Sequence, residues 1–204
     1  PQGETRMKNC FEVQLSVAKT IINEMSKRKN GSVVVATSYL NSYFGYNGIR
    51  RRLFKKYPLG LSRSVDMNLQ GFIDASKQLA DDLKNINAAL ILDAPIPEHP
   101  GFTPDLCSRQ WFRISPSRTC LKTERDFAER QRKHIIDKLE LASRDNSNVY
   151  IFDPFEKFCD DEYCYGAKHN IYRYVDYNHL SKEGALLISG DLVSMIAGLN
   201  AKKE

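Results

Sequence analysis

Asp176 and His179 are the residues of this chain best suited to acid–base chemistry. They lie three positions apart, in a segment of loop-like composition (174–179, YVDYNH) directly before a predicted helix. This spacing lets the carboxylate fold back onto Nδ1 of the imidazole, which fixes the ring tautomer. Nε2 can then take a proton from a hydroxyl group. An isolated Asp-x-x-His pair is more often structural than catalytic. A catalytic role for this pair therefore needs support from the surrounding sequence.

The elements that must position this pair follow from the hydrophobic pattern. Unbroken apolar runs predict buried parallel strands at 32–37, 88–93 and 148–152. Helical spacing predicts helices at 11–25, 69–83, 123–143 and 181–199, with Thr123 and Ser181 as the N-caps of the last two. The alternation of helix and strand predicts an α/β protein, a three-layer α/β/α sandwich around a parallel sheet.

The same pattern predicts which side chains face the sheet. Those of the third helix are Phe127, Ile135, Leu139 and Ala142. Those of the last helix are Ala185, Ile188, Leu192, Met195, Ile196 and Leu199. Reactive groups of such sheets gather beyond the carboxyl ends of the strands, so the loops starting at Ser38, Asp93 and Asp153 are expected to surround the site.

Composition narrows the class of protein. The chain has 204 residues, of which 42% are hydrophobic and 27% charged, as in an ordinary globular domain, and we expect a single domain over 1–204. A net charge of +5 is too modest for a dedicated nucleic-acid binder. No apolar run approaches the roughly 20 residues that span a bilayer, and we expect any targeting segment to lie upstream or to be absent.

The five cysteines predict two loop-closing disulfides. Twelve residues separate Cys107 from Cys120, and four separate Cys159 from Cys164. Two such bonds fit an oxidising compartment, whereas the alternative is a set of reduced, inert cysteines in the cytosol. Cys10 then has no partner in these pairs, and we expect one upstream of Pro1.

The segment that follows the Asp–His pair carries a family resemblance. It continues as His-Leu-Ser-x-x-Gly-Ala over 179–185, which resembles the last conserved block of the SGNH (GDSL-type) hydrolases. In that block the Asp and His complete a Ser-His-Asp triad. Further features resemble the SGNH domains fused to membrane acyltransferases of the acyltransferase-three family: Phe158-Cys159, Cys164, Tyr172, Pro95-x-Pro97 after a buried strand, and Glu129-Arg130.

This resemblance covers about Cys10 to Leu199 and implies a function. Such domains pass acyl groups, usually acetyl, to cell-surface glycans in the periplasm. It implies an acyl donor handed over by a membrane acyltransferase domain, a glycan acceptor, and tethering to the inner membrane by an upstream domain. We expect no cofactor, no metal and no nucleic-acid partner. The alternatives are a GDSL-type esterase or deacetylase, and a non-catalytic module that binds glycan or a partner protein.

The nucleophile block of the family is the main departure. No Gly-Asp-Ser occurs in the sequence, and the three predicted strands correspond to the third, fourth and fifth of the family's five. We therefore expect the nucleophilic serine upstream of this chain. The alternative is Ser38, which follows the first predicted strand, although Thr37 before it lacks the family's carboxylate.

An oxyanion donor is expected near the same strand. The resemblance points to Asn41, whose amide could stabilise the developing charge by about 3 kcal/mol. Its spacing differs from the family's Gly-x-Asn-Asp form, and a loop-capping role is an equal alternative.

Other groups allow weaker interpretations. Two cysteines and two histidines could form a zinc site (Cys159, Cys164, His169 and His179), at the expense of the Asp–His pair. A basic stretch could attract an acidic polysaccharide or form a solvated helix face (Arg50-Arg51-Arg52, Lys55, Lys56 and Tyr57). Trp111 could floor a sugar subsite or anchor its loop, and neither His99 nor His134 has an obvious partner in the sequence.

Overall fold

A computed structural model describes residues 20, 22–27, 32–36, 65–99, 107 and 122–201. Its centre is a parallel sheet of β1 (Ser32–Ala36), β2 (Ala88–Asp93) and β4 (Val149–Phe152), in the order β1-β2-β4. In the register of the sheet, Val34 lies opposite Leu90, and Ile91 lies opposite Tyr150. These strands coincide with the predicted ones to within a residue.

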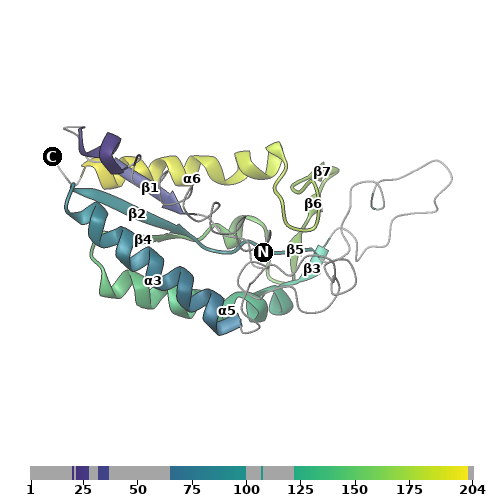
Figure 1. Cartoon of the computed structure of the whole chain (residues 1–204). Coiled ribbons are helices and arrows are strands. Elements are labelled where there is room, and N and C mark those ends of the chain that lie inside the picture. The colour runs from purple at the N-terminus through teal and green to yellow at the C-terminus, as the bar shows by residue number, and fades with distance from the viewer. Residues whose placement is uncertain are drawn as a thin grey trace, which may run out of the picture.

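Helices cover both faces of the sheet (Figure 1). α3 (Val65–Lys84) and α5 (Arg125–Asp145) lie on one face, and α6 (Lys182–Ala201) lies on the other. The predicted three-layer α/β/α architecture is therefore confirmed. None of the helices in the described part of the chain is long and apolar enough to cross a membrane.

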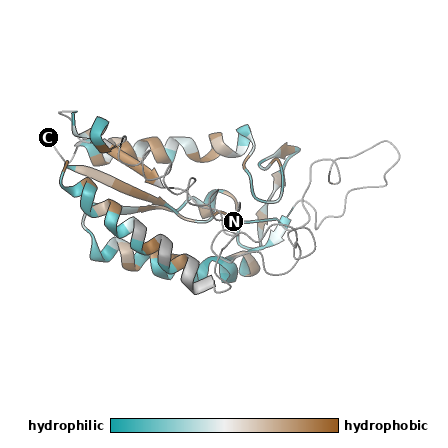
Figure 2. Ribbon diagram, in the orientation of Figure 1, coloured by the Kyte–Doolittle hydropathy of each residue, from teal (hydrophilic) through white to brown (hydrophobic). Residues whose placement is uncertain are grey.

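The core lies in two layers, one on each side of β2. Leu90 and Leu92 point toward α3 and α5, whereas Ala89 and Ile91 point toward α6. All four are at most 1% exposed, which explains the unbroken apolar run, because a strand covered on both faces has no polar side. Figure 2 shows this contrast between hydrophobic strands and the hydrophilic outer faces of α3 and α5. Burying each leucine or isoleucine contributes about 1.5–3 kcal/mol.

Two small antiparallel sheets lie beyond the carboxyl ends of the main strands (Figure 1). One pairs β3 (Lys122–Glu124) with β5 (Tyr163–Tyr165), and the other pairs β6 (Ala167–Lys168) with β7 (Ile171–Tyr172). His169 and Asn170 join β6 to β7 with φ angles of 53° and 64°, as in the two-residue turns of tight hairpins. A short 3₁₀ helix, η3 (Phe155–Lys157), follows β4. These strands are not predictable from the sequence pattern, because two or three residues are too few to show an alternation of apolar and polar side chains.

The predicted N-cap of the third helix is wrong. Thr123 lies in β3, and α5 begins after Glu124, whose side chain makes no capping hydrogen bond. The pairing of β3 with β5 holds the Thr123 backbone extended. The Ser181 cap of α6 is confirmed, because its Oγ accepts a hydrogen bond of 3.0 Å from the Gly184 amide.

Two of the predicted inward side chains are exposed. Phe127 is 37% exposed because the first turn of α5 lies past the sheet, where Ala128 packs on Phe155 instead. Ala185 is exposed for the same reason, since the start of α6 lies beside the β6–β7 hairpin rather than over the sheet (Figure 1). The inward positions further along both helices are buried or partly buried as predicted.

Candidate active site

The Asp–His pair lies in the loop between β7 and α6, at the end of the molecule where the strands of the main sheet finish (Figure 1). The loop closes on itself through a bridge between Tyr174 and Leu180 and a hydrogen bond of 2.9 Å from the Val175 amide to the His179 carbonyl. These contacts leave residues 176–178 at the tip of a short, closed loop.

Asp176 uses both carboxylate oxygens within this loop. Oδ2 lies 2.7 Å from Nδ1 of His179. Oδ1 accepts hydrogen bonds from the amides of Asn178, at 3.0 Å, and His179, at 2.8 Å. Because an ionised carboxylate can only accept, Nδ1 of His179 carries the shared proton. The tautomer that leaves Nε2 basic is therefore the one this geometry favours.

The same contacts keep Asp176 charged. Partial burial alone would raise its pKa, but the hydrogen bonds from the Asn178 and His179 amides and from the His179 ring outweigh that effect and lower the pKa below its ordinary value. The two side chains are 38% and 48% exposed for Asp176 and His179 respectively. Asp176 is thus ionised, and both side chains can be reached by a substrate.

The loop rests on the segment that follows β2. The Tyr174 hydroxyl donates a hydrogen bond of 2.8 Å to the Pro97 carbonyl, and the His99 amide donates one of 2.8 Å to the Tyr177 carbonyl. His99 lies in a loop, as expected, but it is only 2% exposed, and its contacts come from residues far away in the sequence. Pro95-x-Pro97 marks this segment in the sequence, but nothing in the sequence pairs it with Tyr174.

Two acidic residues end the neighbouring strands. Burial, reinforced by the nearby charge of Asp153, raises the pKa of Asp93 to about 7. Its Oδ1 is buried without a hydrogen-bond partner among the described residues. Asp153 instead pairs with the buried guanidinium of Arg132, at 2.5 Å. The sequence places both carboxyl groups at strand ends but does not distinguish their environments.

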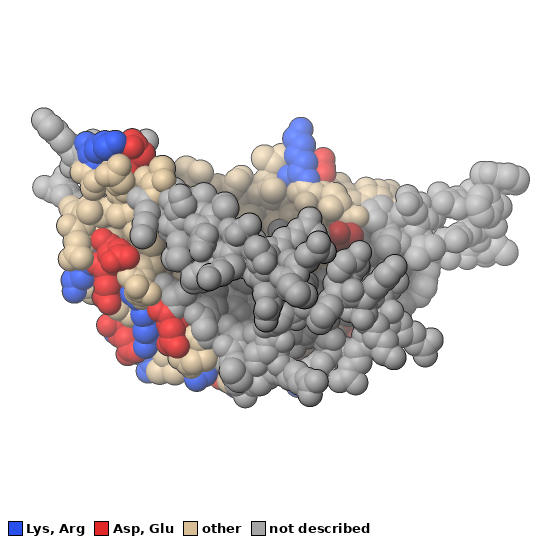
Figure 3. All heavy atoms as spheres, in the orientation of Figure 1, with Lys and Arg blue, Asp and Glu red and all other residues tan. Residues whose placement is uncertain are grey.

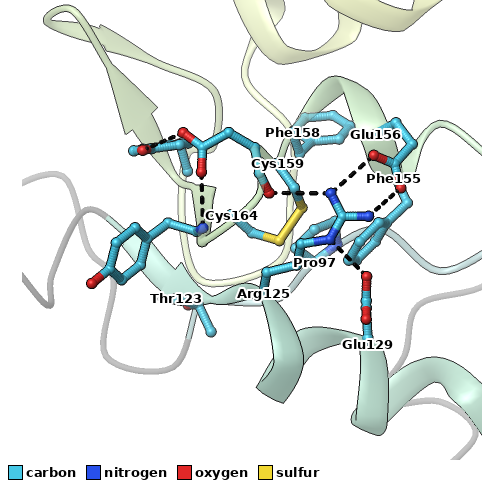
Figure 4. The surroundings of a disulfide bond; sticks show 12 residues. Pro97, Thr123, Arg125, Glu129, Phe155, Glu156, Phe158, Cys159 and Cys164 are labelled. Atoms are coloured by element: carbon cyan, nitrogen blue, oxygen red, sulfur yellow. Dashed lines mark hydrogen bonds and ion pairs between the residues drawn. A yellow bond between two sulfur atoms is a disulfide. The ribbon is translucent and has the colours of Figure 1, made fainter.

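A disulfide joins Cys159 and Cys164 beside this end of the sheet (Figure 4). Arg125, at the start of α5, forms hydrogen bonds to Glu156 and Glu129 next to it. The zinc alternative is wrong in this structure because both of its sulfur atoms are used in the disulfide. Cys107 is also disulfide-bonded, and its predicted pairing with Cys120 stays a prediction because Cys120 lies outside the described residues.

The remaining candidates lie outside the described residues. These are the alternative nucleophile, the oxyanion donor, the remaining cysteines, the tryptophan and the basic stretch: Ser38, Asn41, Cys10, Cys120, Trp111, Arg50-Arg51-Arg52, Lys55, Lys56 and Tyr57. Within the described ranges, no group of three or more His, Cys, Asp or Glu side chains is arranged to hold a metal ion. A hollow of about 500 Å³ lies along α5 and includes Asp153 and Phe155, but neither member of the Asp–His pair lines it.

The fold and the site define a class: an α/β sandwich with a hydrogen-bonded Asp–His pair beyond the carboxyl ends of its parallel strands. Within that class, the sequence model of the family described as "SGNH domain (fused to AT3 domains)" matches residues 2–193. The chain belongs to this family. A search of curated proteins finds no match to the chain.

Proposed function

We propose that this domain transfers acyl groups between oxygen atoms through a Ser-His-Asp triad to which it contributes His179 and Asp176. The observation that carries the proposal is the 2.7 Å contact between Asp176 Oδ2 and His179 Nδ1, made by an exposed pair at the active end of the sheet. Membership of the SGNH family over residues 2–193 supports it, together with the resemblance of residues 179–185 to the family's last conserved block.

The reaction has two halves. His179 Nε2 takes the proton of the serine hydroxyl as its oxygen attacks the acyl carbonyl, and returns that proton to the departing oxygen of the donor. An acceptor hydroxyl then attacks the acyl-serine and gives its proton to Nε2, and Nε2 passes that proton to the departing serine oxygen, which releases the new ester and restores the serine and the neutral imidazole. Asp176 holds the ring in place and stabilises the imidazolium that forms in each half.

The proposed donor is an acyl group, usually acetyl, supplied by a membrane acyltransferase domain, and the proposed acceptor is a glycan hydroxyl. The description of the family as fused to AT3 domains supports such a donor. The Cys159–Cys164 disulfide supports an oxidising compartment outside the cytoplasm, such as the periplasm. If water replaced the glycan, the same site would act as an esterase, so exclusion of water at the acceptor position separates the two activities.

We propose that the serine is supplied from sequence upstream of this chain. The lack of Gly-Asp-Ser in the 204 residues supports this placement, and Ser38 is the competing nucleophile within the chain. Asn41 is retained as the proposed oxyanion donor, and Cys120 as the proposed partner of Cys107.

The test compares hydrolysis of an aryl acetate by the 204-residue chain and by a longer natural protein that includes the upstream sequence. We expect turnover only from the longer protein, and loss of that turnover in His179→Gln. Equal activity of both proteins, abolished by Ser38→Ala, would instead make Ser38 the nucleophile. Inactivity of both toward every ester tried, with intact folding, would favour the binding module.

A further inference from the structure

His99 occupies a buried position between the disulfide-linked region and the loop that carries the Asp–His pair. Its ring Nδ1 lies 3.0 Å from the Thr123 hydroxyl. Its ring meets that of Tyr174 edge to face, with centroids 4.7 Å apart and planes at 77°. Such T-shaped contacts contribute about 0.5–1.5 kcal/mol beyond the area they bury. The imidazole therefore contacts Thr123, in the region of the disulfide, and Tyr174, at the start of the loop that carries the Asp–His pair.

Tyr174 connects His99 to the loop that carries the Asp–His pair. Its side chain is fully buried, its hydroxyl donates to the Pro97 carbonyl, and Phe158 packs on its ring with centroids 5.6 Å apart. Only one residue separates it from Asp176. The His99 amide also donates to the carbonyl of Tyr177, on the other side of Asp176. The loop is thus held both before and after its catalytic carboxylate.

The far side of His99 rests on a cross-linked support. Thr123 pairs in β3 with Cys164 of β5, and Cys164 is bonded to Cys159. Figure 4 shows Pro97 and Thr123 among the residues around this disulfide. The support therefore consists of the strand pair β3–β5, in which β5 is tied by a covalent bond to the segment just before it.

The imidazole stays uncharged in this place. Burial, reinforced by the positive charge of Arg173, lowers the pKa of His99 to about 4. A neutral ring can keep its edge against Tyr174 and one nitrogen on Thr123 at neutral pH without a counter-ion.

We propose that His99 is a positioning residue, which fixes the Asp176–His179 pair by joining Tyr174 and the Tyr177 carbonyl to Thr123. This inference rests on the proposed function for its effect on catalysis. The effect of His99 on the structure can be measured separately from catalysis, by observing the hydrogen bond between Asp176 and His179.

The experiment observes the imidazole protons by NMR in protein labelled with ¹⁵N-histidine. The chain has four histidines, so each resonance can be assigned by replacing one histidine at a time. The Nδ1 proton of His179, shared with Asp176, is expected far downfield and protected from exchange with water. Asp176→Asn should abolish that signal. If the unsubstituted protein lacks it, the proposed function fails at its first step.

The positioning role is tested by His99→Phe and by a matched pair at Thr123. His99→Phe keeps an aromatic ring but loses the nitrogen, Thr123→Val loses the hydroxyl at constant shape, and Thr123→Ser keeps the hydroxyl. We expect faster exchange of the His179 Nδ1 proton in the first two variants and near-normal exchange in Thr123→Ser. In the longer, active protein, kcat should fall by about tenfold or more with KM little changed, because small misplacements of a catalytic group cost factors of this order.

General loss of stability is controlled with Leu139→Ala, a cavity variant in the core under α5. Leu139→Ala is expected to lower the unfolding temperature without altering the His179 signal or its exchange. The proposal is overturned if His99→Phe and Thr123→Val, at temperatures where they are folded, leave that signal and its exchange as in the unsubstituted protein. It is also overturned if Leu139→Ala changes them as much.

Discussion

Asp176 acts through its two oxygens in two different ways. Oδ1 accepts two backbone amides and so fixes the carboxylate within its own loop, while Oδ2 is left to hold the imidazole. Replacing the Asp176 carboxylate by an amide of the same shape separates these two roles. The amide oxygen can still accept hydrogen bonds from the backbone amides, but the side chain no longer carries the negative charge that faces the imidazole.

Asp176→Asn is therefore expected to fold normally and to lose activity. Its amide no longer stabilises the imidazolium, and a comparable change in a known triad lowers kcat about 10⁴-fold. The measurement is kcat for an aryl acetate in the longer protein, with circular dichroism to verify folding. A loss smaller than tenfold would show that the carboxylate has no catalytic role.

The sequence predicted this pair because its contact is local. Asp176 and His179 are three residues apart, and so are Ser181 and Gly184 in the cap of α6. The contacts of His99 and Tyr174 were missed because they join distant segments: His99 and Thr123 are 24 positions apart, and Pro97 and Tyr174 are 77 positions apart. A short-range pattern carries no signal for a partner at that distance.

At the scale of elements, the start of α6 fixes the end of the loop that carries the Asp–His pair. Its capping serine bonds the Gly184 amide and donates a hydrogen bond of 2.7 Å to the Tyr172 carbonyl, which ties the helix to β7. Gly184 lies so close to the loop that a Cβ at this position would overlap the Arg173 carbonyl oxygen. The rest of α6 has few charged residues, as Figure 3 shows by comparison with the side of α3 and α5.

Two glycine substitutions in this helix should have opposite effects. Gly184→Ala is expected to destabilise the protein by several kcal/mol, because the backbone oxygen of Arg173 cannot move aside as a flexible side chain could. Gly190→Ala should stabilise it by up to about 1 kcal/mol, because nothing lies within 4 Å of the added Cβ and alanine favours helix.

Urea unfolding of the two variants and the unsubstituted protein gives both values. Equal effects of the two substitutions would contradict the close approach of α6 to the loop. Loss of stability in Gly190→Ala alone would contradict the packing of α6 described above.

The longer elements were predictable because each shows a hydrophobic period over its full length. β2 is buried on both faces, and the inward stripe of α5 includes Ile135, Leu139 and Ala142. The helix starts were less predictable. Thr123 was misassigned because β3 takes up the residue that was predicted to cap α5. Phe127 and Ala185 were misassigned because the first turns of α5 and α6 lie past the sheet.

At the scale of the whole molecule, the free energy of unfolding depends on pH through two buried groups, Asp93 and His99, whose effects have opposite sign. The pKa of Asp93 rises from 3.8 to about 7 on folding, so its stabilising effect is full below 3.8 and is lost as pH rises toward 7. The pKa of His99 falls from 6.5 to about 4, so its effect is full above 6.5 and is lost as pH falls toward 4. Between these limits the two slopes, each about 1.4 kcal/mol per pH unit, oppose each other.

Asp93→Asn is expected to reveal this balance. Near pH 4, roughly where Asp93 is still protonated, the variant and the unsubstituted protein should unfold at similar temperatures. Near pH 8, roughly a unit above its pKa, the variant should be the more stable, because it buries an amide in place of a carboxylate. A difference in unfolding temperature that is the same at both pH values would contradict the assigned pKa.

Asp160→Asn provides a control of opposite sign. The Tyr165 hydroxyl and the amides of Tyr163 and Glu162 hold the pKa of Asp160 far below its ordinary value. The stabilising effect of Asp160 is present above the ordinary carboxyl pKa and lost in acid. Its replacement should therefore reduce stability at neutral pH, where Asp93→Asn increases it.

The most direct test of the central claim is labelling of the longer protein with a fluorophosphonate, in which the serine oxygen displaces fluoride from phosphorus. The triad predicts one phosphonate per molecule by mass spectrometry, on a single serine, with the labelling rate greatly reduced in both His179→Gln and Asp176→Asn. A labelling rate that neither substitution changes would contradict the assignment of this pair as the base that activates the serine.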